Sequence, residues 1–150
     1  MAGRGQKLRR RSSEREQSVA VILIVEDEVF IRDLAELMVE EFGHTSLSAS
    51  DMDEALVLLR SPQRIDALFT DIRLKTAVLG GYELAQLAIK LRPQLRVLYA
   101  SGNSTTDKTK ALFVRGARFL QKPYSPEGLK GAIEDLLAAP DDLARPIPSL

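Results

Sequence analysis

Two short apolar runs, each ending on a carboxylate, constrain the fold of this chain more than any other feature. Residues 19–25 form an unbroken, mostly β-branched run that stops at Glu26, and residues 66–71 (Asp-Ala-Leu-Phe-Thr-Asp) end on Asp71. Runs of this length without polar alternation are typical of strands buried on both faces of a parallel sheet. Carboxylates that follow such strands would lie just outside the strand ends, where open α/β sheets place their sites.

Helical patterns separate these runs from further short strands. Strands are predicted at 19–25, 45–48, 66–70, 95–100 and 118–121, and helices at 30–42, 51–60, 82–91, 105–114 and 125–137. Ser50 or Asp51 is expected to cap the second of these helices, and Ser125 the last. Strands that alternate with helices of this length are typical of βαβ units, with a parallel sheet and right-handed crossovers. The pattern therefore predicts one α/β domain, and a chain of this length has room for a core that folds without staples.

The first predicted helix is amphipathic. Its apolar residues recur at helical spacing and are expected to form the stripe that packs on the sheet. They are Phe30, Leu34, Leu37, Met38 and Phe42. Gly43 then ends the helix, as a C′ residue does. His44 follows directly, and we interpret it as a surface residue of the helix–strand loop.

Composition excludes several classes of site. The chain has no cysteine and a single histidine, which removes disulfides, thiolate metal sites and a cysteine nucleophile, and leaves little room for a zinc site or a serine triad. No apolar run approaches the ~20 residues that span a membrane, and the N-terminus lacks the apolar segment of a secretory signal. We therefore expect a cytoplasmic protein with no membrane association.

Charge is spread unevenly along the chain. Residues 1–18 carry six basic and two acidic residues, a net charge of +4, so the remainder carries −4 because the total is zero. Low hydrophobicity in this segment predicts a disordered basic tail. Residues 139–150 contain three prolines and no periodicity, so they are predicted to be a second tail, which leaves 19–138 as the folded domain.

The predicted sheet brings five polar residues to one edge. Strand one ends in Glu26 and Asp27, strand three in Asp71, strand four in Ser101 and strand five in Lys122. Singly, the acids and the serine could be helix caps and the lysine a solvated side chain. Together, three acids would repel one another unless a cation is present, and an all-oxygen site suits Mg²⁺. With a hydroxyl and an ammonium to bind phosphate, the set predicts phosphoryl transfer with a carboxylate as the possible nucleophile.

Five spaced motifs now identify a family. They are Val25-Glu26-Asp27-Glu28, Thr70-Asp71, Gly81, Ser101-Gly102 and Lys122-Pro123, in that order along the chain. With them, the chain resembles the receiver domain of bacterial two-component response regulators over residues 19–138. The resemblance implies a doubly wound, flavodoxin-like (βα)5 sheet with strand order 2-1-3-4-5.

The resemblance also implies a role for each residue at this edge. Asp71 would be the phosphoacceptor, which takes a phosphoryl group from a histidine kinase or a phosphotransfer protein. Asp27 would bind Mg²⁺ directly and Glu26 mainly through water, with Asp71 and the backbone carbonyl of Arg73 as further ligands. Ser101 and Lys122 would contact the phosphoryl oxygens.

Further implied features concern the switch and the phosphoryl lifetime. Phe119 falls at the family's aromatic switch position, where the ring rotates inward as Ser101 is drawn to the phosphate. Phe119 lacks the hydroxyl of the commoner tyrosine. Arg73 and Asn103 occupy the positions that tune the lifetime of the acyl phosphate. The Lys122–Pro123 peptide bond is expected to be cis.

The sequence departs from the family after Asp71. The segment from Ile72 to Gly81 is two residues longer than in many receivers and lacks their Met-Pro and Asp-Gly pairs. Arg73 or Lys75 is placed to reach the acid cluster from this loop, where a side chain could replace or weaken Mg²⁺. We expect this loop to distinguish the chain from its relatives.

These observations predict a single-domain response regulator that catalyses only its own phosphorylation and dephosphorylation. As no output domain is expected after residue 138, its signal would leave by protein contact through the helix at 105–114, the strand at 118–121 and the last helix. A monomer or weak dimer is expected. Two alternatives are a Mg²⁺-dependent phosphohydrolase or nuclease on a similar sheet, and a DNA-binding regulator that acts through the basic tail.

Overall fold

The apolar runs form the strands of one parallel sheet. The computed structural model describes residues 19–75 and 77–140. In chain order the elements are β1 (Val21–Val25), α2 (Val29–Glu41), β2 (Thr45–Ala49), α3 (Met52–Arg60), β3 (Ala67–Asp71), α4 (Gly80–Leu91), β4 (Arg96–Ser101), α5 (Asp107–Lys110), β5 (Arg118–Gln121) and α6 (Pro126–Ala138). All strand pairs are parallel and the order is β2-β1-β3-β4-β5. The predicted fold is confirmed. The predicted tail 1–18 lies outside the described residues, and so does the predicted tail 139–150 except for its first two residues, which follow the end of α6.

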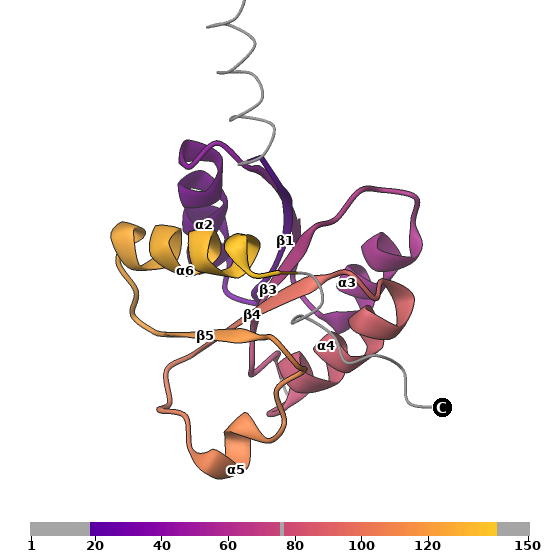
Figure 1. Ribbon diagram of the computed structural model, residues 1–150, viewed down its shortest axis with the longest axis vertical. Helices are drawn as coiled ribbons and strands as arrows, with labels where there is room; N and C mark the ends of the chain where they lie inside the picture. The colour runs from indigo at the N-terminus through magenta and orange to yellow at the C-terminus, as the bar shows by residue number, and fades with distance from the viewer. Residues whose placement is uncertain (1–18, 76, 141–150) are drawn as a thin grey trace, which may run out of the picture.

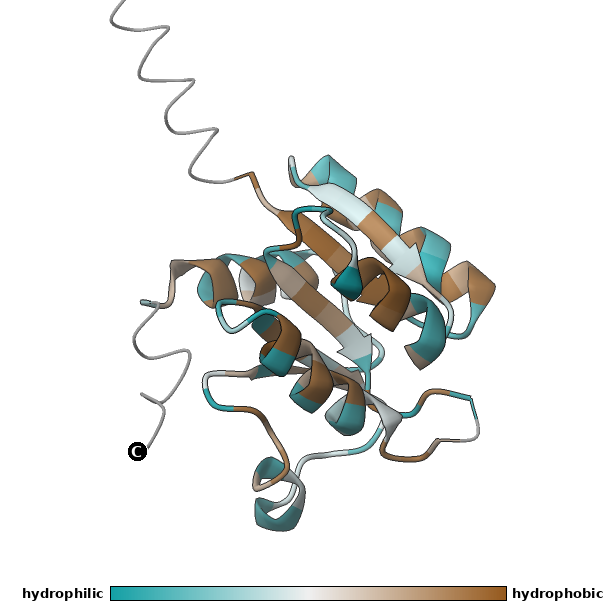
Figure 2. Cartoon of the chain, turned by 90° about the vertical axis from the view of Figure 1, so that its right-hand side faces the viewer, coloured by the Kyte–Doolittle hydropathy of each residue, from teal (hydrophilic) through white to brown (hydrophobic). Residues whose placement is uncertain are grey.

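Side chains alternate along the strands between two apolar layers, as the pleat requires. On β1, Leu23 and Val25 face the layer that contains α3 and α4, whereas Ile22 and Ile24 face the layer that contains α2 and α6. Figure 1 shows α2 and α6 together on one side of the sheet and α3 and α4 on the other. In Figure 2 the strands at the centre of the sheet are largely brown and one edge strand is mostly pale, and β1, β3 and β4 are the strands whose residues are mainly buried. None of the described helices has the length and apolarity needed to cross a bilayer.

Local capping fixes the helix ends where the sequence predicts it. Asp51 accepts a hydrogen bond from the Glu54 N–H (2.9 Å) at the start of α3. Ser125 accepts one from the Gly128 N–H (2.9 Å) at the start of α6. Gly43 follows α2 with a φ of +93°, a conformation that glycine adopts without steric cost.

The predicted apolar stripe of α2 is only partly correct. Its members Met38 and Phe42 pack against the core, but Phe30 is 88% exposed, Leu34 53% and Leu37 58%. The other residues that α2 buries are Ala35 and Val39, which were not in the predicted stripe. The helix therefore packs on the sheet through a narrow face that includes the small residue Ala35. Three large side chains of the predicted stripe face outward.

The predicted helix at 105–114 is also wrong in length. α5 covers only Asp107–Lys110, and none of its residues is buried. Thr106 and Thr109 form a capping box that stabilises this single turn. The chain then turns inward, where the Val114 N–H donates to the buried Tyr99 hydroxyl (3.2 Å).

His44 is buried rather than on the surface. Only 8% of it is exposed, and its Nδ1 accepts a hydrogen bond from the Ala20 N–H (3.0 Å). Burial lowers the pKa of His44 from its usual 6.5, and the charges of Glu134 and Asp66 oppose this only in part. The neutral imidazole thus ties the start of β1 to the loop before β2.

This arrangement predicts a loss of stability below about pH 6.5. Above the unfolded-state pKa of 6.5, His44 is neutral in both states. Below it, the unfolded chain binds a proton that the folded chain resists, so the free energy of unfolding falls as the pH falls. In His44→Asn, an amide oxygen can accept the Ala20 N–H without titrating. Urea unfolding between pH 7.5 and 5.5 should show a steeper decline for the wild type; parallel curves would contradict the prediction.

Candidate functional site

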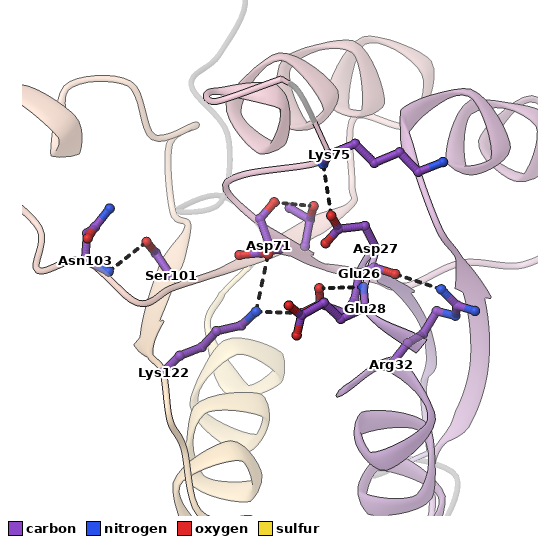
Figure 3. Close-up of polar contacts among 10 residues, drawn as sticks. Glu26, Asp27, Glu28, Arg32, Asp71, Lys75, Ser101, Asn103 and Lys122 are labelled. Carbon is purple, nitrogen blue, oxygen red and sulfur yellow. Dashed lines mark hydrogen bonds and ion pairs between the residues drawn. The ribbon is translucent and has the colours of Figure 1, made fainter. Parts of the chain in front are cut away.

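Three carboxylates meet at the carboxyl edge of the sheet. Glu26 and Asp27 follow β1, and Asp71 is the last residue of the adjacent β3. One carboxylate oxygen from each lies within 4.8 Å of the other two. Figure 3 shows the three side chains converging on one region between the strand ends. The predicted convergence of the acids is therefore present in the structure.

Lys122 joins this cluster from the end of β5. Its Nζ donates to Glu26 Oε1 (2.6 Å) and lies 3.3 Å from Asp71 Oδ2. Figure 3 shows the lysine reaching across to both carboxylates. The Lys122–Pro123 peptide bond is cis, as expected. One ammonium group thus faces two of the three acids.

The environment changes the proton affinities of this set. Burial raises the pKa of Glu26, and hydrogen bonds from Lys122 and from the Glu28 N–H counteract it only in part. Burial likewise raises the pKa of Asp71, against the opposing charge of Lys122. For Lys122, burial alone would lower the pKa, but the hydrogen bond to Glu26 and the charge of Asp71 outweigh it and raise the pKa. The lysine therefore stays charged beside acids that are costly to ionise.

Ser101 lies beside this cluster without joining its ion pairs. It ends β4, next to β3, and its Oγ accepts a hydrogen bond from the Asn103 N–H (3.1 Å). Ser101 and Asn103 line a hollow with Arg73, Tyr82 and Phe119. The exposed Arg73 makes no ion pair with an acid among the described residues.

The predicted switch residue belongs to an aromatic group behind this hollow. Phe119 is half-buried and stacks on Phe113, with ring centroids 6.2 Å apart. Phe113 in turn contacts Tyr99 (4.7 Å) and Tyr82 (5.9 Å). The ring therefore packs toward the core in this structure.

The longer segment after β3 folds into a small hairpin. Leu74 and Ala77 exchange two backbone hydrogen bonds (3.0 and 2.8 Å). Leu74 is 3% exposed and belongs to the core layer of α3 and α4. Lys75, at the tip, has a φ of 53°, which is uncommon for a residue with a side chain.

Lys75 reaches the acids through its backbone, not through its ammonium group. Its N–H donates to Asp27 Oδ2 (3.2 Å), while its Nζ pairs with Asp51 Oδ2 (3.1 Å). Figure 3 shows the lysine side chain directed away from the other acids. The pKa of Asp51 is lowered, first by the Glu54 N–H and then by Lys75. Asp51 caps α3 and, because it follows β2, also lies at the same edge of the sheet; the capping pattern in the sequence indicates only the first of these two roles.

Gly81 sets the distance between this edge and α4. A Cβ there would lie 2.3 Å from the carbonyl oxygen of Asp71 and 2.7 Å from Cα of Ile72. The Gly81 N–H donates to the Ile72 carbonyl (2.7 Å). Only a residue without a side chain fits here, so Gly81 lets the helix begin directly against the strand end that carries Asp71.

The donor set fits a hard divalent cation. All three side chains offer oxygen, and Lys122 balances only part of their charge. Asp27 forms no salt bridge within the described part of the chain. Carboxylates with incomplete charge compensation and room for water are the usual setting of Mg²⁺.

A doubly wound sheet of order 2-1-3-4-5, with acids and a lysine at its carboxyl edge, is the architecture of phosphorelay signalling domains of the CheY-like class. The chain belongs to the response regulator receiver domain family, whose model matches residues 22–134.

Curated relatives support this assignment. The chain is 33% identical over 109 residues to the nitrogen assimilation regulatory protein NtrX of Azorhizobium caulinodans, covering 72% of this chain and 24% of that protein. It is 32% identical over 113 residues to the transcriptional regulatory protein YrkP of Bacillus subtilis, covering 75% and 47%. The match thus spans between a quarter and a half of these curated relatives.

Solved structures agree. A response regulator receiver protein from Sinorhizobium medicae superposes with a TM-score of 0.73 at 26% identity, covering 81% of this chain and 96% of that one. NtrX from Brucella abortus gives a TM-score of 0.71 at 33% identity, covering 79% and 27%.

Replacement of Gly81 should disrupt the junction of β3 and α4. In Gly81→Ala the added methyl group clashes with backbone atoms of Asp71 and Ile72. These atoms can move only if the end of β3 shifts, so we expect a loss of about 1–3 kcal/mol in the free energy of unfolding. Gly131→Ala is the control, because a Cβ there meets nothing within 4 Å in α6; it should gain about 0.5–1 kcal/mol. Urea unfolding measures both, and a Gly81→Ala protein as stable as the wild type would contradict this reading.

Proposed function

We propose that this chain is a phosphoacceptor receiver in which Asp71 takes a phosphoryl group from the phosphohistidine of a histidine kinase or a phosphotransfer protein. The observation that carries the proposal is the bridge from Lys122 to both Glu26 and Asp71 at 2.6 and 3.3 Å, within a cluster of three carboxylates. A half-buried lysine beside a half-buried carboxylate provides a fixed positive charge and a nucleophile for an incoming phosphoryl group.

Glu26, Asp27, Asp71 and the backbone carbonyl of Arg73 would hold Mg²⁺. The fit rests on the all-oxygen donor set and on the uncompensated charge of Asp27. When bound, Mg²⁺ would supply neutralisation of the phosphoryl oxygens during transfer.

In the proposed transfer, a carboxylate oxygen of Asp71 bonds to phosphorus as the bond between phosphorus and the histidine nitrogen breaks, and the imidazole leaves with that electron pair. Lys122 would follow the phosphoryl group and contact one of its oxygens. Ser101 would exchange its hydrogen bond with the Asn103 N–H for one to another phosphoryl oxygen. Phe119 would respond to this movement, and the face of α5, β5 and α6 would carry the signal to a downstream protein.

The same geometry suggests how the acyl phosphate would be lost or protected. Asn103 would orient an attacking water, and Arg73 would shield the phosphoryl group, since both line the hollow beside Ser101. Catalysis would thus be confined to the chain's own phosphorylation and dephosphorylation. We further propose that the chain acts in the cytoplasm as a monomer or weak dimer.

The phosphohydrolase or nuclease alternative gains no support from the family match. The DNA-binding alternative rests on residues 1–18, which lie outside the described residues. NtrX and YrkP are named as regulatory proteins, and the parts of those proteins beyond the receiver have no counterpart in the matched residues.

Incubation with acetyl phosphate and Mg²⁺ tests the proposal. Intact mass should increase by one phosphoryl group in the wild type and stay unchanged in Asp71→Asn. EDTA should abolish the gain, because the acids then lack their cation. Asp53→Asn, at an exposed position in the first turn of α3, is the matched control and should behave as the wild type. A gain that survives Asp71→Asn would overturn the assignment of the phosphoacceptor.

The outward face of α2 is the proposed contact for the phosphodonor. This face consists of Phe30, Leu34 and Leu37, spaced at i, i+4 and i+7 and all more than half exposed. Phe30 comes three residues after Asp27, in the turn that adjoins the acid cluster. A partner that presents a phosphohistidine to Asp71 must cover this rim, and exposed apolar side chains there would anchor an apolar helix of the partner.

Truncation of this face should therefore slow phosphoryl transfer from a histidine kinase without slowing phosphorylation by acetyl phosphate. In Phe30→Ala/Leu34→Ala, transfer from whichever histidine kinase phosphorylates the wild type fastest should slow about tenfold or more, since losing apolar anchors weakens docking. Phosphorylation by acetyl phosphate should stay within twofold. Val57→Ala, on the exposed side of α3, is the control. Equal slowing with both donors would show that the face has no docking role.

A further inference from the structure

The hairpin after β3 connects three strand ends at the acidic edge. Its tip residue, Lys75, contacts Asp27 after β1 through the backbone and Asp51 after β2 through the side chain, at 3.2 and 3.1 Å. Its root is the strand that carries Asp71. None of these contacts takes part in the proposed phosphoryl transfer to Asp71, so we consider a different role for the hairpin.

The hairpin is anchored rather than loosely attached. Leu74 packs in the core and pairs with Ala77, and the Gly80 N–H donates to the Ala77 carbonyl (3.1 Å). With its base held in this way, the position of the tip depends on few contacts. The Lys75–Asp51 ion pair attaches the tip to the residues that follow β2.

The hydrogen bond to Asp27 has a direct consequence for cation binding. One oxygen of Asp27 is occupied by the Lys75 N–H, which fixes the rotation of the carboxylate. The orientation of a ligating carboxylate is commonly set by such an outer contact, and its loss weakens metal affinity.

The geometry points to Lys75 and Asp51 as positioning residues for the cation: their ion pair holds the hairpin tip so that the Lys75 N–H orients Asp27 toward Mg²⁺. This inference rests on the proposed function, since it assumes that the acid cluster binds Mg²⁺. The inference gives a role to the extra length of the segment after Asp71, which is two residues longer than in many receivers.

Two substitutions break the pair without removing the contacts around it. Lys75→Asn keeps the backbone N–H and tolerates the positive φ, because asparagine adopts that region readily. Asp51→Asn keeps an N-cap for α3, since asparagine caps as well as aspartate. Lys90→Asn, an exposed lysine near the far end of α4, matches the charge change of Lys75→Asn away from the site.

The experiment is a Mg²⁺ titration of the full chain, followed by the amide signals of residues at the acidic edge in NMR spectra. The Kd for Mg²⁺ should rise about two- to fivefold in Lys75→Asn and in Asp51→Asn, in keeping with the modest strength of an exposed ion pair. The double variant should be no weaker than either single one, because both break the same contact. Without Mg²⁺, the amide of residue 75 should exchange its hydrogen faster in Asp51→Asn than in the wild type.

Other results would overturn the inference. Simple charge effects would tighten Mg²⁺ binding in Lys75→Asn and weaken it in Asp51→Asn. In the double variant these two opposite effects would largely cancel. A hairpin that blocks the site would make both single variants bind more tightly, and unchanged affinities would leave the pair without a role. A wild type that binds no Mg²⁺ would remove the inference together with the metal part of the proposed function, and the wild-type titration reveals this before any variant is compared.

Discussion

The structure depends on holding three carboxylates together at the end of a buried sheet. Glu26 is only 5% exposed, and burying an acid beside two others would favour protonation unless positive charge is supplied. Lys122 supplies part of it, and the negative charge that remains is of the kind that suits a small, hard cation. The parallel sheet makes this crowding possible because it delivers every strand end to one edge. The chemistry of the domain thus follows from its topology together with one lysine.

The sequence predicted those parts of the fold that are set by local pattern. Buried parallel strands are nearly continuous apolar runs, so β1, β3 and β4 were visible within one or two residues, and the strand ends then identified the acids, Ser101 and Lys122. The caps at Asp51 and Ser125 were visible for a similar reason, since a capping side chain acts on residues within the next turn.

Features that depend on how elements pack were not predictable in the same way. On α2, two adjacent stripes are both apolar, and only the geometry of the sheet decides that Ala35, Met38 and Val39 are buried while Phe30 faces out. His44 appeared to be a loop residue because nothing local reveals that Ala20, 24 residues away, donates to it. The pairing of Lys75 with Asp51 depends on a hairpin whose shape is set by a backbone contact between Leu74 and Ala77.

The burial of Leu74 ties the acidic edge to the packing of the domain. The hairpin that contacts Asp27 has its root in the layer of α3 and α4, so this segment is part of the core and not an appendage to it. Fluctuations that loosen that layer would shift the hairpin and, with it, the outer contact of Asp27, while the strands themselves remain paired. The same few residues therefore pack in the core and contact Asp27, so if the acids bind a cation as proposed, the local stability of one helical layer would help to determine its affinity at the sheet edge.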